Sequence, residues 1–270
     1  MIYRSSSQSF KFDIPLCIKY CEEIKNNGNI DENLIGQFTG TNIPKVKENL
    51  NYLRFCDLID DNQISLFGTK ILYLKNNPEF VEPLLFYKLS RGCKNGGHYY
   101  FSRLINDTLY NIAFEVVNFK KQADILNLAI LSDKESEYCR DRDKKEYFRQ
   151  ALSMGLADAT TGFGKMGMVV NNNDNYEISG YIPHNLITAY ILYDNWPAGR
   201  TALKISEVIS NDYLPGKIFF LGRDIINQQL HELALEKIIF VEQEAGLDQI
   251  RLNPQLTADD ILDRMVNLAN

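Results

Sequence analysis

Apolar side chains between residues 43 and 55 recur at the spacing of an α-helix. The stripe consists of Ile43, Val46, Leu50 and Leu53. This i, i+3, i+7, i+10 pattern predicts an amphipathic helix with one buried side. Asn42 or Thr41 can cap its start, and Pro44 suits the first turn of a helix.

Two shorter helices are predicted before this stretch and a hairpin after it. Asp13 can cap the first helix, which the sequence Asn26-Asn27-Gly28 ends, and Asp31 can cap the second, which ends at Gly40. Residues 58–66 form a hairpin pattern around the turn Asp60-Asp61-Asn62, and a further helix follows. Helices followed by a hairpin are typical of a winged helix-turn-helix, a module used for DNA binding and for protein docking. Its recognition helix would be the 43–55 segment.

The rest of the chain predicts a helical middle and a second unit of similar order. Residues 79–91 and 98–119 indicate helices around a glycine-containing break at 92–97, and a hairpin is expected near 166–180. Beyond this hairpin, Pro183 opens a further helix. The carboxy-terminal third predicts a helix over 201–210, a short element and a helix after Asp224. A hairpin of 237–242 with 248–252 and a last helix over 258–268 complete it.

These elements predict a mainly α protein with small β-hairpins. The expected domains are a winged helix over residues 1–77, a helical middle over 78–198 and a winged-helix-like unit over 199–270.

Composition is typical of a globular protein, and the net charge bears on which ligand the protein binds. The 270 residues are 45% hydrophobic and 24% charged, which are ordinary values for a globular chain. The net charge of -6 argues mildly against autonomous DNA binding, because such proteins are usually basic over the contact face. No apolar run is long enough to span a membrane and no signal peptide is apparent, so we expect a cytoplasmic protein. The five cysteines show no zinc-ligand spacing, so neither a metal nor a cofactor is expected.

The polar side of the predicted recognition helix provides the candidate DNA-binding residues. They are Asn42, Lys45, Lys47, Asn51, Tyr52 and Arg54. Lysine and arginine neutralise phosphates, and asparagine can bind the edge of adenine. Glu48, Asp60 and Asp61 would repel phosphate, so the ligand stays open between DNA and a protein partner or second copy.

A catalytic alternative depends on the most charged segment of the chain. It contains Asp133, Glu135, Glu137, Asp141, Asp143, Lys144 and Lys145. Carboxylates beside a lysine suit a Mg²⁺-dependent nuclease, but ligands on a helix or loop favour an ion-paired surface. The run Gly162–Gly167 lacks the serine or threonine of a phosphate-binding loop, because Met166 stands there. The three histidines are scattered and are interpreted as helix-terminal or surface residues, so no catalytic residue is assigned.

The order of several segments resembles an uncharacterised bacterial winged-helix family. Its genes lie beside phosphosulfate-reductase-like genes in DNA-modification and phage-defence islands. Residues 65–68 and 77–82 stand at the positions of two family motifs, and residues 214–233 are similar to the carboxy-terminal part. Asn77 and Pro83 replace two acidic residues of the family pattern, and a tryptophan-rich helix is absent. The resemblance implies a role in defence or DNA modification and supplies no catalytic residues.

The leading expectation is a non-enzymatic DNA-binding or adaptor subunit. The alternatives are a structural subunit that assembles with a protein partner or second copy, and a metal-dependent nuclease that uses the 133–145 carboxylates.

Overall fold

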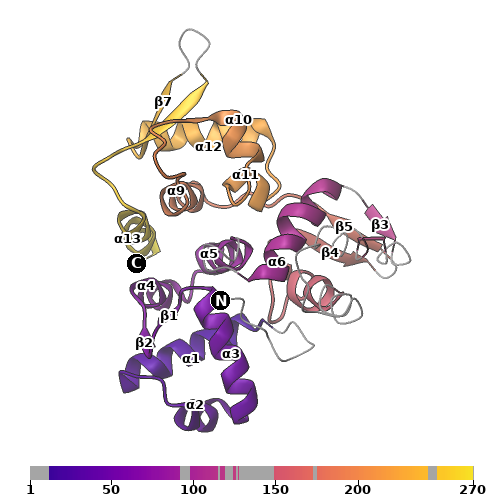
Figure 1. The fold of residues 1–270 in the computed structure, drawn as a ribbon, viewed down its shortest axis with the longest axis vertical. Coiled ribbons are helices and arrows are strands. Elements are labelled where there is room, and N and C mark those ends of the chain that lie inside the picture. The colour runs from indigo at the N-terminus through magenta and orange to yellow at the C-terminus, as the bar shows by residue number, and fades with distance from the viewer. Residues whose placement is uncertain are drawn as a thin grey trace.

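The computed structural model describes residues 12–91, 98–114, 116–118, 124–125, 127, 149–172, 175–242 and 248–269. Within these residues the protein is mainly helical, with small sheets of two or three strands (Figure 1). The predicted fold class is confirmed at this level. Among the described residues, no helix combines the length and the apolar character needed to cross a membrane.

The amino-terminal region has the predicted order of helices and hairpin. Its elements are α1 (Ile14–Asn27), α2 (Glu32–Thr39), α3 (Ile43–Phe55), β1 (Ile59–Asp60), β2 (Gln63–Ile64) and α4 (Leu66–Leu74). Asp13, Asp31 and Asn42 cap the first three helices by accepting backbone N–H groups, as the sequence predicts. The second strand is shorter than expected, because Ser65 Oγ accepts the N–H of Gly68 at 2.8 Å and starts α4.

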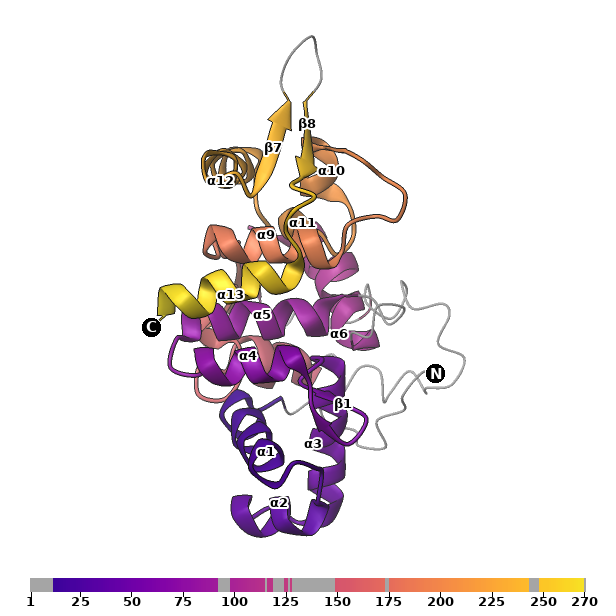
Figure 2. The ribbon, with the colours of Figure 1, turned by 90° about the vertical axis from the view of Figure 1, so that its left-hand side faces the viewer.

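The middle region begins with the central helix of the molecule, α5 (Pro78–Ser90). Nearly all of its side chains are buried, because it lies between α4 on one side and the carboxy-terminal elements on the other (Figure 2). The helix α6 (Tyr99–Arg103) continues into a π-helical turn (Leu104–Leu109) and a 3-10 turn (Tyr110–Ile112). Two further short turns, a π-helical one (Ala151–Leu156) and a 3-10 one (Gly164–Met166), precede the next strands.

The single helix predicted over 98–119 is therefore wrong beyond Ile112. The backbone of Phe114 has a positive φ of 70°, and its N–H donates to the carbonyl of Ile178. The following residues form β3 (Val116–Asn118), whose two valines favour an extended backbone. The strand β3 pairs with β5 (Asn175–Ile178), which also pairs with β4 (Val169–Asn172) as the predicted hairpin.

The carboxy-terminal region has a three-stranded sheet in the order β6-β8-β7. Its elements are α9 (Asn185–Asp194), β6 (Leu203–Lys204), α10 (Ile205–Ser210), α11 (Pro215–Ile218), α12 (Arg223–Leu235), β7 (Ile239–Glu242), β8 (Gln249–Leu252) and α13 (Ala258–Ala269). The hairpin and the last helix agree with the prediction. The helix predicted from residue 201 begins only at Ile205, because Leu203 pairs with Ile250 of β8.

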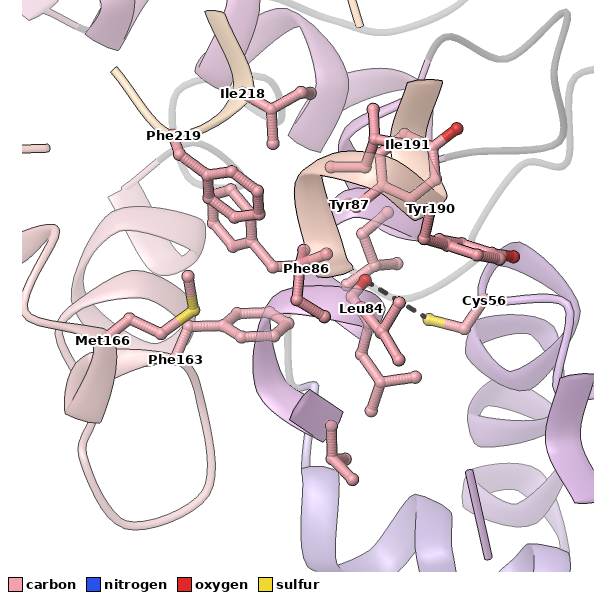
Figure 3. Packing of buried hydrophobic residues seen from close by; sticks show 14 of the residues in the cluster. Cys56, Leu84, Phe86, Tyr87, Phe163, Met166, Tyr190, Ile191, Ile218 and Phe219 are labelled. Carbon is pink, nitrogen blue, oxygen red and sulfur yellow. Dashed lines mark hydrogen bonds between the residues drawn. The ribbon is translucent and has the colours of Figure 1, made fainter. Parts of the chain in front are cut away.

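One continuous core joins the three regions. Phe86 of α5 contacts the rings of Phe163 and Phe219 at centroid distances of 5.2 and 5.8 Å (Figure 3). It also contacts the ring of Phe101 at 5.5 Å. The last helix, α13, packs on both α9 and α4, and therefore connects the carboxy-terminal region to the amino-terminal one. The three predicted domains share this core, and their boundaries stay a prediction.

Candidate interaction surfaces

The exposed side of α3 carries three cations, and each has a polar partner nearby. Lys45 Nζ lies 2.8 Å from a carboxylate oxygen of Glu48, and Lys47 Nζ lies 3.4 Å from that of Glu32 on α2. The guanidinium of Arg54 donates to Oδ1 of Asn51 at 3.3 Å. The surface of α3 is therefore a mixture of paired charges rather than a continuous positive face.

Asn42 and Tyr52 have structural roles in this arrangement. The Asn42 side chain accepts the backbone N–H of Lys45 and so caps α3. Tyr52 is only 2% exposed, and its ring stacks on His98 at 5.8 Å between centroids. The structure thus brings Asn42, Lys45, Lys47, Asn51 and Arg54 to the surface of one helix, and places Tyr52 in the core.

The hairpin beside α3 is acidic at its tip. Asp60 ends β1 and Asp61 begins the turn to β2; both are exposed, and Asp61 has a positive φ of 46°. Because carboxylates repel phosphate, this turn does not extend the cationic side chains of α3 into a larger positive surface.

The carboxy-terminal region presents a helix in the position equivalent to α3. In the order of elements, α12 follows α10 and α11 and precedes the β7–β8 hairpin. Its exposed side carries Arg223, Gln228 and His231, and Arg223 lies 3.4 Å from Asp248, the residue before β8. We did not predict these residues as a site from the sequence. The matching order of helices and hairpin was the signal that could have indicated them.

A buried group of charges lies where the three regions meet. Lys88 of α5 is 2% exposed and contacts Asp57 at 3.2 Å and Asp194 at 2.8 Å. Arg91 forms ion pairs with the same two carboxylates. The Tyr87 hydroxyl donates to Asp194 at 2.8 Å.

The charges in this group compensate one another. Burial lowers the pKa of Lys88 and the Arg91 guanidinium lowers it further, whereas Asp194 and Asp57 act in the opposite direction. Burial alone would raise the pKa of Asp194, but the Lys88 ammonium holds it below its usual value. The ammonium already occupies the space between the two carboxylates that a metal ion would need. The arrangement therefore suits a structural connection better than a metal centre.

A shallow pocket of about 330 Å³ lies among α1, α2 and α4. It is lined by Glu22, Lys25, Asn26, Phe38, Leu72, Tyr73 and Lys75. Phe38 is 55% exposed and Tyr73 is 57% exposed, so two large aromatic side chains stand beside the pocket in contact with water.

The described part of the chain contains no group of three or more histidine, cysteine or acidic side chains arranged to hold a metal. Cys17, Cys21 and Cys56 are buried, and burial raises the pKa of Cys21 to about 12. The acidic cluster predicted at 133–145 lies outside the described residues.

Two of the three histidines lie at helix starts. His98 Nδ1 accepts the N–H of Phe101 at 3.5 Å, and His184 Nδ1 accepts the N–H of Leu186 at 3.2 Å. His231 is exposed on α12. The interpretation of the histidines as helix-terminal or surface residues is therefore confirmed.

Comparisons with known proteins show similarity at the level of the fold. No family model and no curated protein matches the sequence. Two solved structures, described as "SspB crystal structure" and "Magnesium ion-bound SspB crystal structure", are similar, each with a TM-score of 0.72. Each similarity covers 96% of this chain and 86% of the other chain at 13% sequence identity. This likeness establishes a shared overall fold.

Proposed function

We propose that the protein is a non-enzymatic DNA-binding or adaptor subunit of a DNA-modification or phage-defence assembly. The main support is the repeated order of elements, in which α3 and α12 each follow shorter helices and precede a hairpin. In a winged helix-turn-helix this position belongs to the recognition helix, which enters the major groove of DNA. The resemblance to the defence-island family supports the biological setting. A protein that contacts chromosomal or phage DNA would act in the cytoplasm.

DNA would approach the exposed side of α3. Lys45, Lys47 and Arg54 would contact phosphates, whereas Asn42 and Asn51 would lie nearest to the base edges. The pairs of Lys45 with Glu48 and of Lys47 with Glu32 are partly exposed. Surface pairs of this kind contribute only about 0–1 kcal/mol, so phosphate can replace the carboxylates as a partner at little cost. Tyr52 would support α3 from the core and would not contact DNA.

The test replaces both lysines, Lys45→Glu and Lys47→Glu, in the full chain. Duplex affinity is measured by mobility shift at several salt concentrations. The variant should bind more weakly, and its plot of log affinity against log salt should be shallower by about 2, because two phosphate contacts are lost. The control is Lys75→Glu, directly after α4, where Lys75 pairs with Glu22. If the double variant binds like the parent, α3 is not the DNA contact.

If the protein is instead a structural assembly subunit, the purified chain should give a different result in the same DNA-binding experiment. The acidic net charge favours this role, and winged-helix units also serve protein docking. A stable dimer or complex with no duplex affinity at low salt would favour a structural assembly subunit instead.

A second candidate, a metal-dependent nuclease, is favoured by one specific observation. One of the two similar structures is described as magnesium ion-bound. In this chain the candidate ligands are the carboxylates of residues 133–145. Incubation with supercoiled plasmid and Mg²⁺ or Mn²⁺ tests it, with Asp141→Ala and Asp143→Ala as variants and EDTA as a control. Metal-dependent nicking that both variants abolish would replace the non-enzymatic proposal.

A further inference from the structure

The pocket among α1, α2 and α4 is built from three helices of the amino-terminal region. The second half of α1 contributes Glu22, Lys25 and Asn26, α2 contributes Phe38, and α4 contributes Leu72 and neighbouring residues. Both α2 and α4 pack directly on α1, so α1 forms the floor and the other two helices form the walls. The pocket residues belong to α1, α2 and α4, apart from Lys75 directly after α4, and α3 contributes none of them.

Three large apolar or aromatic side chains, Phe38, Leu72 and Tyr73, form the walls of this pocket on α2 and α4. Phe38 and Tyr73 are both more than half exposed although they stand beside it. Leu34, one helical turn before Phe38, is 42% exposed and extends the apolar strip along α2. Grouped exposed hydrophobic residues with a polar rim are typical of protein-interaction sites, where aromatic residues are enriched.

The rim carries an excess of positive charge. Lys75 forms an ion pair with Glu22 at 2.6 Å, so these two charges compensate each other. Lys25 Nζ lies 4.9 Å from the centre of the Tyr73 ring and makes no ion pair within the described part of the chain. The Lys25 ammonium beside the Tyr73 ring can therefore bind the carboxylate of a ligand whose apolar side chain packs on the ring.

We propose that this pocket binds a segment of a partner protein with one or two large apolar side chains next to an aspartate or glutamate. The volume of about 330 Å³ is at the small end for ligand pockets and suits one or two side chains. A DNA duplex does not fit these features, because phosphates require an array of cations, whereas this rim has two lysines, one of them paired with Glu22, beside apolar walls. The proposal is independent of DNA binding by α3.

The test pans the purified full chain against a phage-displayed library of random twelve-residue peptides. Enriched peptides should carry a large apolar residue within one helical turn of Asp or Glu. Panning against Lys25→Glu should replace the acidic preference with a preference for Lys or Arg. The matched control Lys237→Glu, at an exposed lysine in the carboxy-terminal region, should enrich the same acidic peptides as the parent.

A second variant tests the apolar wall. Phe38→Ser should weaken binding of a synthetic enriched peptide by about tenfold or more, as expected for an aromatic anchor. Because Phe38 is 55% exposed, the variant should keep the parent's circular dichroism and melting temperature. Absence of enrichment, or equal peptide binding by the Phe38→Ser variant, would overturn the proposal. A dimer in sedimentation that Phe38→Ser dissociates would also overturn it, because the pocket would then bind a second copy.

Discussion

The ammonium nitrogen of Lys88 lies 2.8 Å from Oδ2 of Asp194, and the lysine side chain is almost completely buried. Lys88 belongs to the central helix α5, and Asp194 is the last residue of α9. The same ammonium contacts Asp57, which follows α3 with a positive φ of 54°. This group of charges therefore connects the end of α3 to the start of the carboxy-terminal region through α5.

We expect Asp194→Ala to destabilise the whole fold strongly. The substitution leaves the Lys88 ammonium and the Arg91 guanidinium buried with Asp57 as their remaining carboxylate. Removing one partner of a buried ion pair costs about 3–5 kcal/mol, because a buried charge loses its compensation. Urea denaturation followed by circular dichroism measures the free energy of unfolding.

The control for this substitution is Asp212→Ala, which removes a more exposed partner of Lys217. Surface pairs contribute about 0–1 kcal/mol, so this variant should unfold close to the parent. Equal losses in the two variants would show that the buried group does not stabilise the fold.

Local signals allowed most element positions to be predicted. Asp13, Asp31 and Asn42 were recognised as caps because capping depends on a few neighbouring residues. The β7–β8 hairpin was also found, because alternation and turn residues are local features. These signals positioned the helix α3 and therefore the main candidate surface.

Tertiary contacts decided the features that were missed. Lys88 lies on a helix that is buried on all sides, and nothing in its own segment indicates that its charge meets Asp57 and Asp194. The strand β3 was read as helix because its partner β5 lies about 60 residues later, and only that pairing makes the extended backbone favourable. For the same reason Tyr52 was assigned to the surface, since the contact with His98 is not local.

Tyr52→Ala should therefore act on stability rather than on DNA contact. The ring of Tyr52 packs against Phe12, Phe55 and His98 at centroid distances of 5.7–6.3 Å. Removing a large buried ring costs about 3–5 kcal/mol. The control Tyr73→Ala removes a tyrosine that is 57% exposed, and its free energy of unfolding should change by roughly 0.5 kcal/mol or less. A Tyr52→Ala protein of parental stability that lost duplex binding would restore Tyr52 as a contact.

The stability of the protein should decrease as the pH falls below about 6.5, because of His98. In an unfolded chain histidine has a pKa near 6.5, whereas burial lowers the pKa of His98 in the folded protein to about 3. Between these two pKa values the unfolded chain binds one more proton than the folded protein. The contribution of neutral His98 to the free energy of unfolding is therefore complete above about pH 6.5. This contribution decreases by up to ~1.4 kcal/mol per pH unit as the pH falls towards the pKa of His98 in the folded protein.

Urea titrations between pH 7 and pH 4 measure this dependence. His98→Asn keeps a residue that can cap α6 but removes the titrating group, so its free energy of unfolding should vary less with pH than the parent's. The exposed His231→Asn should leave the pH dependence unchanged. If NMR shows the His98 imidazole of the folded protein titrating near pH 6.5, the burial argument is wrong.

The close approach of α4 to Leu58 and Ile64 can be tested by a substitution at Gly68. A Cβ atom at this position would lie 2.1 Å from the carbonyl oxygen of Leu58 and 2.9 Å from Cγ1 of Ile64. Alanine normally favours a helix over glycine by about 1 kcal/mol, but here the backbone must move, so we expect Gly68→Ala to destabilise by about 1–3 kcal/mol. The control is Gly222→Ala at the start of α12, where an added Cβ meets nothing within 4 Å. In thermal unfolding, Gly68→Ala should have a lower melting temperature than the parent and than Gly222→Ala. A Gly68→Ala protein more stable than the parent would contradict this packing of α4.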